Sequence, residues 1–129
     1  MSFLSKLFGQ RSNSSEKITI LDPETYAKAI DMGQVQLVDV RTASEYLSGH
    51  IKDAKNIDWF KQKNFTESVK KLDKDQEVYL YCRSRARSLK AGRKLLNMGF
   101  TKVHDLKGGF NAWKRLDRSS DNSAWGTSM

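Results

Sequence analysis

The sequence contains one cysteine, one proline and two histidines among its 129 residues. A single cysteine excludes an internal disulfide framework and a cysteine-rich zinc site. Because the histidines, His50 and His104, lie far apart, we expect neither a structural metal nor a cofactor. No hydrophobic run approaches membrane-spanning length. The composition therefore predicts a protein of the reducing cytoplasm, without a transmembrane segment, in which a lone thiol stays available.

The length is that of one domain, which we place at residues 18–116. Residues 1–17 and 117–129 are predicted to be flexible tails, since both are polar and serine-rich over much of their length. The first tail carries apolar residues at roughly helical spacing: Phe3, Leu4, Leu7 and Phe8. A short helix that contacts a membrane or a partner is the alternative for that segment.

Strand and helix signals alternate along the domain. Strands are predicted at residues 18–21, 37–40, 54–57, 78–81 and 102–106. Helices are predicted from Pro23 to Gly33, after the Thr42 capping box, through 65–72, from the arginine-rich loop to Gly99, and around Trp113. This alternation predicts an α/β fold with a central parallel sheet of about five strands and helices on both faces.

Cys82 stands between the clearest predicted strand, residues 78–81, and the start of a predicted helix. Unpaired N–H groups and the helix dipole favour an anion there, and favour a thiolate over a thiol. From Cys82 to His104 there are seven basic residues and no carboxylate, so most of the net charge of +8 surrounds the cysteine. The pattern indicates a reactive thiolate that meets an anionic substrate. An inert, buried cysteine is the alternative.

Polar residues near other predicted strand ends have structural interpretations. Asp39 and Arg41 follow the 37–40 strand and are expected to organise the loops by hydrogen bonds and ion pairs. Glu45 is the last residue of a capping box and is expected to cap a helix. His50 is expected to be a structural histidine, and His104 has no evident partner. Trp113 is expected in the core.

Several short motifs, in order, resemble the rhodanese-like family, the single-domain sulfurtransferases. They extend over about residues 18–115. The matching pieces are Asp39-Val40-Arg41, Glu45-Tyr46, Gly49-His50-Ile51, Ala54 with Asn56-Ile57, the Cys82 loop, and Leu106-Lys107-Gly108-Gly109 with Trp113. The resemblance implies a rhodanese-like fold and a thiosulfate sulfurtransferase activity.

In such an enzyme Cys82 takes the outer sulfur of a small anionic donor and holds it as a persulfide, then passes it to a thiol-bearing protein or small thiol. The substrate-binding residues implied are those of the loop: Arg83, Ser84, Arg85, Ala86, Arg87 and Ser88. Arg83 and Arg87 are assigned to the donor, the serines to hydroxyl hydrogen bonds, and the loop backbone to N–H donation. Ser88 as a helix cap is the alternative for that residue. Asp39, Arg41 and His50 support the site.

Three positions depart from the family pattern. Arg85 stands where the family usually has glycine, which predicts either a left-handed residue under strain or a different local backbone. Lys52 and Asp58 replace the family's usual prolines, which affects loop geometry more than chemistry.

Other functions remain open on sequence. Related phosphatase loops place five residues between cysteine and arginine, whereas four separate Cys82 from Arg87 here, which favours a smaller cradle. A non-enzymatic persulfide carrier or docking module has the same sequence features as a transferase. Nucleic-acid binding, suggested by the sequence pI of about 9.7, is disfavoured because the charge surrounds the cysteine and no known motif accompanies it. We expect a monomer.

Overall fold

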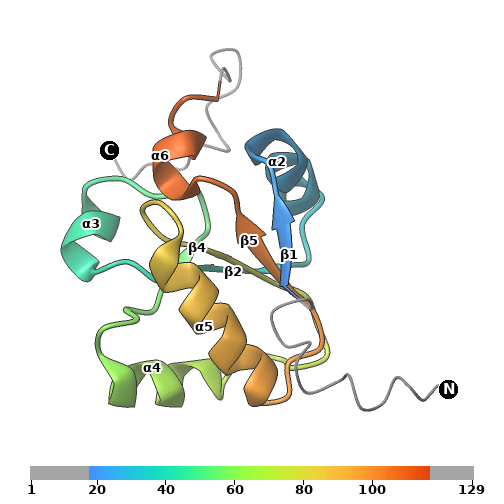
Figure 1. Ribbon diagram of the computed structural model, residues 1–129, viewed down its shortest axis with the longest axis vertical. Helices are drawn as coiled ribbons and strands as arrows, with labels where there is room; N and C mark the ends of the chain where they lie inside the picture. Colours follow the sequence, from blue (N-terminus) through green and yellow to red (C-terminus); the bar gives the residue numbers. More distant parts are fainter. Residues whose placement is uncertain (1–17, 117–129) are drawn as a thin grey trace, which may run out of the picture.

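The computed structural model describes residues 18–116, so the expectations for the two tails lie outside the described residues. Five parallel strands form one sheet in the order β1-β5-β4-β2-β3 (Figure 1). Their bounds are Ile18–Leu21, Gln36–Asp39, Lys55–Asn56, Val78–Tyr81 and Val103–Leu106 for β1 to β5. The predicted fold class is confirmed. Within this part of the chain, no helix combines the length and apolar character that a bilayer span requires.

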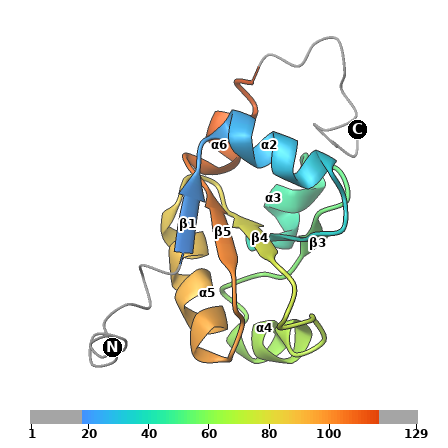
Figure 2. The same ribbon diagram turned by 90° about the vertical axis from the view of Figure 1, so that its right-hand side faces the viewer.

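The middle of the sheet is apolar on both faces, as parallel sheets require. All four residues of β4 are buried. Strands β5 and β2 pair with it on either side, and Figure 2 shows β5 beside β4. Parallel strands place their carboxyl ends at one edge, and open α/β folds bind ligands there. Cys82 follows the last residue of β4, so it lies at this edge.

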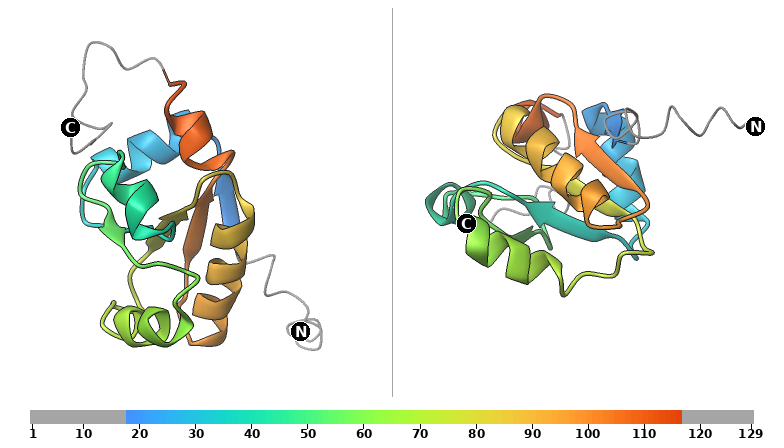
Figure 3. Two further views of the ribbon diagram at one scale, coloured as in Figure 1. Left: turned by 90° about the vertical axis from the view of Figure 1, so that its left-hand side faces the viewer. Right: turned by 60° about the horizontal axis from the view of Figure 1, so that its bottom comes forward.

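Helices cover both faces of the sheet. The helices are α2 (Pro23–Asp31), α3 (Ala43–Leu47), α4 (Gln62–Val69), α5 (Ala86–Asn97) and α6 (Gly109–Trp113). Side chains of α4 and α5 pack with one apolar cluster, and those of α2 and α6 with the other. Lys94 of α5 donates hydrogen bonds to Gln62 and Thr66, and α4 lies beside α5 in Figure 3. Trp113 is fully buried, as predicted.

Local signals set most helix ends. Asp22 accepts a hydrogen bond from the Thr25 N–H at the start of α2. At the end of α5, Gly99 has φ +104° and Phe100 donates its N–H to the Leu95 carbonyl, which is a Schellman arrangement at the predicted helix end. Among the helices, α4 is displaced from its predicted position: it spans residues 62–69 rather than 65–72, because Lys61 provides no side-chain cap to mark its start. Strand β2 begins and ends one residue earlier than predicted.

Candidate active site

Cys82 lies between β4 and α5 with its sulfur enclosed. Its exposed fraction is 1%. The Ser88 N–H donates to Sγ at 3.4 Å, and the thiol donates to Ser88 Oγ at 3.4 Å. The N–H of Ser88 belongs to the first turn of α5, before the first bond along the helix, from Leu89 to the Arg85 carbonyl. The sequence therefore located the cysteine correctly at a helix N-terminus.

The loop residues after Cys82 divide into an exposed rim and a buried floor. Residues 83–86 are exposed, Arg87 is half-buried and Ser88 is buried. Ser88 is not the helix cap: α5 begins at Ala86, and the Ser88 hydroxyl donates to the Arg85 carbonyl at 3.0 Å. The cap position belongs to Arg85, whose side chain makes no capping bond.

Arg85 does not adopt the left-handed conformation considered from the family pattern. Its φ is −176°, which is extended backbone open to any residue. The positive-φ residues other than glycine are Gln34 and Asp53, within residues 18–116. The loop therefore accommodates arginine without the strain for which a glycine would be needed.

Arg87 is bound by a carboxylate rather than left free for substrate. Its guanidinium donates to both carboxylate oxygens of Glu45, at 2.7 and 3.0 Å, and lies 5.3 Å from the centre of the Phe60 ring. Glu45 also completes the predicted capping box of α3 with Thr42. The hydrogen bonds from Arg87 hold the pKa of Glu45 at about 2. One carboxylate thus caps α3 and ties it to α5.

This ion pair predicts a defined loss of acid stability. The folded pKa of Glu45 lies below its ordinary 4.5, so its contribution is complete above 4.5 and is lost as pH falls towards about 2. Glu45→Gln is expected to lower the free energy of unfolding by about 1–2 kcal/mol at neutral pH, after allowance for solvent screening of this partly exposed pair. Urea titrations of both proteins at neutral and strongly acidic pH measure the difference.

The exposed pair of Glu67 and Lys70, at 3.6 Å, offers a matched control. Glu67→Gln should change stability by no more than about 0.5 kcal/mol at either pH. A deficit in Glu45→Gln that persisted undiminished in strong acid would show that its cause is not the carboxylate charge.

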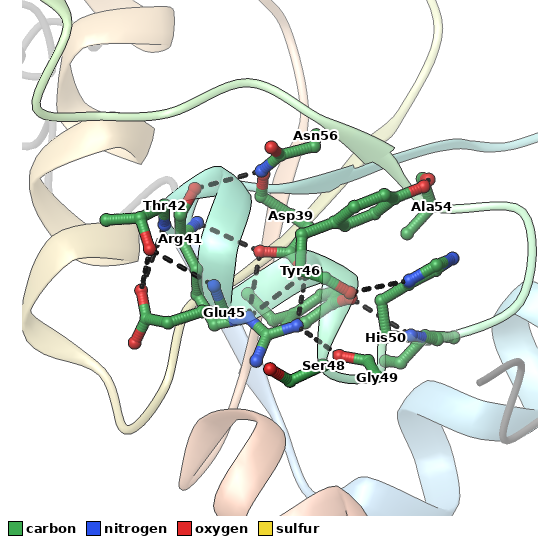
Figure 4. Close-up of polar contacts among 12 residues, drawn as sticks. Asp39, Arg41, Thr42, Glu45, Tyr46, Ser48, Gly49, His50, Ala54 and Asn56 are labelled. Carbon is green, nitrogen blue, oxygen red and sulfur yellow. Dashed lines mark hydrogen bonds and ion pairs between the residues drawn. The ribbon is translucent and has the colours of Figure 1, made fainter. Parts of the chain in front are cut away.

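Asp39 and Arg41 form a buried ion pair beneath the site. Arg41 donates from Nη2 to Asp39 at 2.7 Å and to the Gly49 carbonyl at 2.7 Å (Figure 4). The Asn56 side chain donates to the backbone carbonyls of both residues. The Arg41 guanidinium also lies 4.4 Å from the centre of the Phe110 ring. These contacts join β2, β3 and α6. They agree with the expectation that Asp39 and Arg41 organise the loops.

The two histidines both have partners. His50 Nδ1 is 2.9 Å from the Tyr46 carbonyl, and the two rings stack at 3.7 Å. The structural interpretation of His50 is therefore supported by its contacts. The expectation that His104 lacks a partner is wrong: its Nε2 is 2.8 Å from Glu77 Oε1, and its ring stacks on Tyr79.

The start of α6 holds the β4–α5 loop through its backbone. The N–H groups of Phe110 and Asn111 donate to the carbonyls of Cys82 and Arg83, at 2.9 and 3.0 Å. In Figure 1 the β4–α5 loop and α6 lie at the same end of the sheet. Gly109 allows this approach, since a Cβ there would lie 2.6 Å from the Cys82 and Arg83 carbonyl oxygens. Sequence identified the glycine pair but not this contact.

Asp105, which the sequence interpretation did not select, lies in β5 close to the same loop. It is fully buried, and burial raises its pKa to about 6. The signal available in the sequence was an acidic residue between two apolar positions, Val103 and Leu106, of a predicted strand.

A pocket of about 290 Å³ opens beside the loop. Residues of α3 line one side, and Arg83, Asn111 and Lys114 line the other. Two exposed cations therefore face a space large enough for a small anionic molecule.

Comparisons with known proteins match the same part of the chain. The model of the rhodanese-like domain matches residues 22–116. The chain belongs to the rhodanese-like family. A sulfurtransferase of Allochromatium vinosum is 35% identical over 96 residues, which cover 74% of this chain and 87% of that protein. Rhodanese-like relatives with sulfurtransferase names support this class of chemistry in general.

Two further rhodanese-like matches limit how much of a relative's function can be transferred to this chain. The uncharacterized protein YqhL of Bacillus subtilis is 39% identical over 80 residues, and this chain spans only 61% of its length. A Saccharomyces cerevisiae crystal structure, described as a homologue of single-domain rhodanese and of the Cdc25 phosphatase catalytic domain, is 25% identical with a TM-score of 0.69. That match covers 84% of this chain and 87% of the yeast chain.

Proposed function

We propose that this protein is a sulfurtransferase that moves a sulfane sulfur from thiosulfate, or from a persulfide donor, to a thiol or another nucleophilic acceptor. The observation that carries the proposal is the enclosed Cys82 sulfur. It receives the Ser88 N–H at the start of α5 and lies under an exposed rim that contains Arg83 and Arg85. A helix N-terminus and a cationic rim suit both a thiolate and the anion it attacks.

The reaction proceeds in two displacements at sulfur. The Cys82 thiolate attacks the outer sulfur of thiosulfate; the S–S bond of the donor breaks, and sulfite leaves with the bonding electron pair. The acceptor thiolate then attacks the outer sulfur of the Cys82 persulfide, and the Cys82 thiolate leaves. The Ser88 N–H and the other free N–H groups of the first α5 turn stabilise the negative sulfur in both states.

The loop residues share the binding of the donor. Arg83 and Arg85 supply exposed positive charge, Ser84 a hydroxyl donor, and Ala86 a backbone N–H at the start of the helix. Arg87 acts through its bonds to Glu45, which hold the loop in place. The pocket lined by Arg83 and Lys114 gives the donor or a small thiol acceptor a cationic approach.

Sulfite release tests the activity directly. Purified protein, thiosulfate and an excess of thiol acceptor should yield sulfite over many turnovers, while an aryl phosphate monoester should release no phosphate. A single equivalent of sulfite without turnover would instead indicate a persulfide carrier. Phosphate release without sulfite would indicate the phosphatase alternative.

A further inference from the structure

Asp105 is a buried carboxylate on the same face of the sheet as the catalytic cysteine. Successive side chains of a strand alternate between faces. Val103 packs in the apolar cluster with α5, whereas Leu106 packs in the opposite cluster, so Asp105 faces α5. Its exposed fraction is 0%, and neither carboxylate oxygen has a hydrogen-bond partner of ordinary geometry within residues 18–116. Burying a polar group without a hydrogen bond costs free energy of folding, so such a group calls for an explanation.

The strand register places Asp105 beside the sulfur. Asp105 pairs with Leu80 of β4, and Cys82 lies two residues beyond Leu80 on the same face. Ser88 lies between the two groups: its hydroxyl accepts from Cys82 Sγ, and its side chain interacts with the Asp105 carboxylate. Cys82, Ser88 and Asp105 thus form a short row of polar side chains inside an otherwise apolar layer.

The charges around Asp105 are few. Arg85 acts on it from the start of α5, and Cys82 faces it from β4. From α2, the Tyr26 hydroxyl is close enough to feel its charge but is held by the Leu80 carbonyl at 2.9 Å. On β1 the residue opposite is Ile20. Burial therefore dominates and raises the pKa of Asp105 to about 6, which brings this carboxylate nearer to a thiol in proton affinity.

We propose that Asp105 is a positioning residue that receives the thiol proton of Cys82 through the Ser88 hydroxyl. The thiol already donates to Ser88 Oγ. The Ser88 hydroxyl turns from the Arg85 carbonyl to the carboxylate; the S–H bond breaks, an O–H bond forms on Asp105, and the hydroxyl is regenerated. The buried group carries one negative charge before and after, so no additional charge is desolvated. The inference deepens the proposed function, on which it rests for its biological purpose.

Alkylation of Cys82 by iodoacetamide, followed against pH, reads the thiolate without any sulfur transfer. Since cysteine and carboxylate share a proton, the wild-type rate is expected to rise in two steps, the first near the Asp105 pKa of about 6. Asp105→Asn cannot accept the proton. It is expected to lose the first step and to be alkylated in a single step, at a neutral-pH rate no lower than that of wild type, because loss of the carboxylate charge also favours the thiolate. Ser88→Ala should lose the same step, and the double variant should be no slower than the slower single variant.

A simple repulsive charge makes a different prediction. If Asp105 only disfavours the thiolate and takes no proton from it, the wild-type rate will rise in one step with none near pH 6, and that result overturns the relay. A two-step profile that survives in Asp105→Asn overturns it as well. His104→Asn removes a titratable side chain from the same strand on the opposite face, and it should keep both steps. Should Asp105→Asn not fold, Ser88→Ala decides alone: two steps in that variant contradict the relay.

Stability provides an independent readout of the same carboxylate. With a folded pKa raised from 3.8 to about 6, Asp105 holds its proton more strongly in the folded state, so wild-type stability falls as pH rises through that window. Asp105→Asn should melt above wild type at neutral pH, and the gap should close in acid. Normal two-step alkylation without sulfite release would refute the proposed function and leave the relay intact.

Discussion

Cys82→Ser is expected to abolish sulfur transfer while the protein remains folded. A serine hydroxyl cannot form a persulfide, so sulfite release should fall by roughly 10³-fold or more. Serine differs from cysteine by one atom, and Ser88 offers the new hydroxyl a hydrogen-bonding partner. The free energy of unfolding, followed by thermal melts, should therefore change by no more than about 1 kcal/mol. Steady-state sulfite release and a melting curve on the same preparation measure both effects.

The chain makes this variant unusually easy to interpret. Cys82 is the only cysteine, so no other thiol can take over the reaction and the variant should take up no alkylating reagent. Cys82→Ala serves as a second variant in which no hydroxyl is introduced. Wild-type sulfite release from either variant would show that the nucleophile has been misassigned.

Gly109→Ala is expected to have the largest effect on stability. Gly109 has φ +60°, and an added Cβ would meet the Cys82 and Arg83 carbonyl oxygens at 2.6 Å. Both neighbours are backbone atoms held by α6, so relief requires the loop or the helix to move. The strained φ and the overlap together should cost about 3–5 kcal/mol. Sulfur transfer should fall as well, because the displaced carbonyls belong to the loop that positions the thiol.

Gly33→Ala separates the two contributions. Gly33 also has a positive φ, +76°, but nothing lies within 4 Å of a Cβ built there. It should therefore lose only about 1–2 kcal/mol, the cost of the left-handed backbone, and keep full activity. Denaturant unfolding of the two variants gives the difference. Equal losses would mean that α6 does not pack closely against the loop after Cys82.

The fold could be predicted from sequence because its signals are local. Val78–Tyr81 is four apolar β-formers in a row, and it is the fully buried strand β4. The Thr42 and Glu45 capping box and the Gly99 helix end also depend on residues close in sequence, and all are present. The start of α4 was misplaced because Lys61 and its neighbours provide no capping signal.

The site was predicted less completely because its decisive contacts are long-range. The partner of Arg87 is 42 residues away in Glu45, and that of His104 is 27 residues away in Glu77. Neither pairing follows from a motif, since both depend on which strands and helices become neighbours. Asp105 is a stronger case: only the parallel register of β4 and β5 places it beside Cys82. The position of Cys82 follows from the predicted strand and helix on either side of it. The positions of the groups around Cys82 follow from how distant elements pack together.

Mass spectrometry of the intact protein after incubation with thiosulfate tests the central proposal most directly. One added sulfur atom is expected, located on Cys82 by fragmentation, removed by a thiol acceptor and absent from Cys82→Ser. The addition should form with release of one equivalent of sulfite, since the inner sulfur of the donor leaves in that form. A wild-type protein of unchanged mass, with its thiol shown by alkylation to be free and reactive, would contradict a persulfide mechanism at this site.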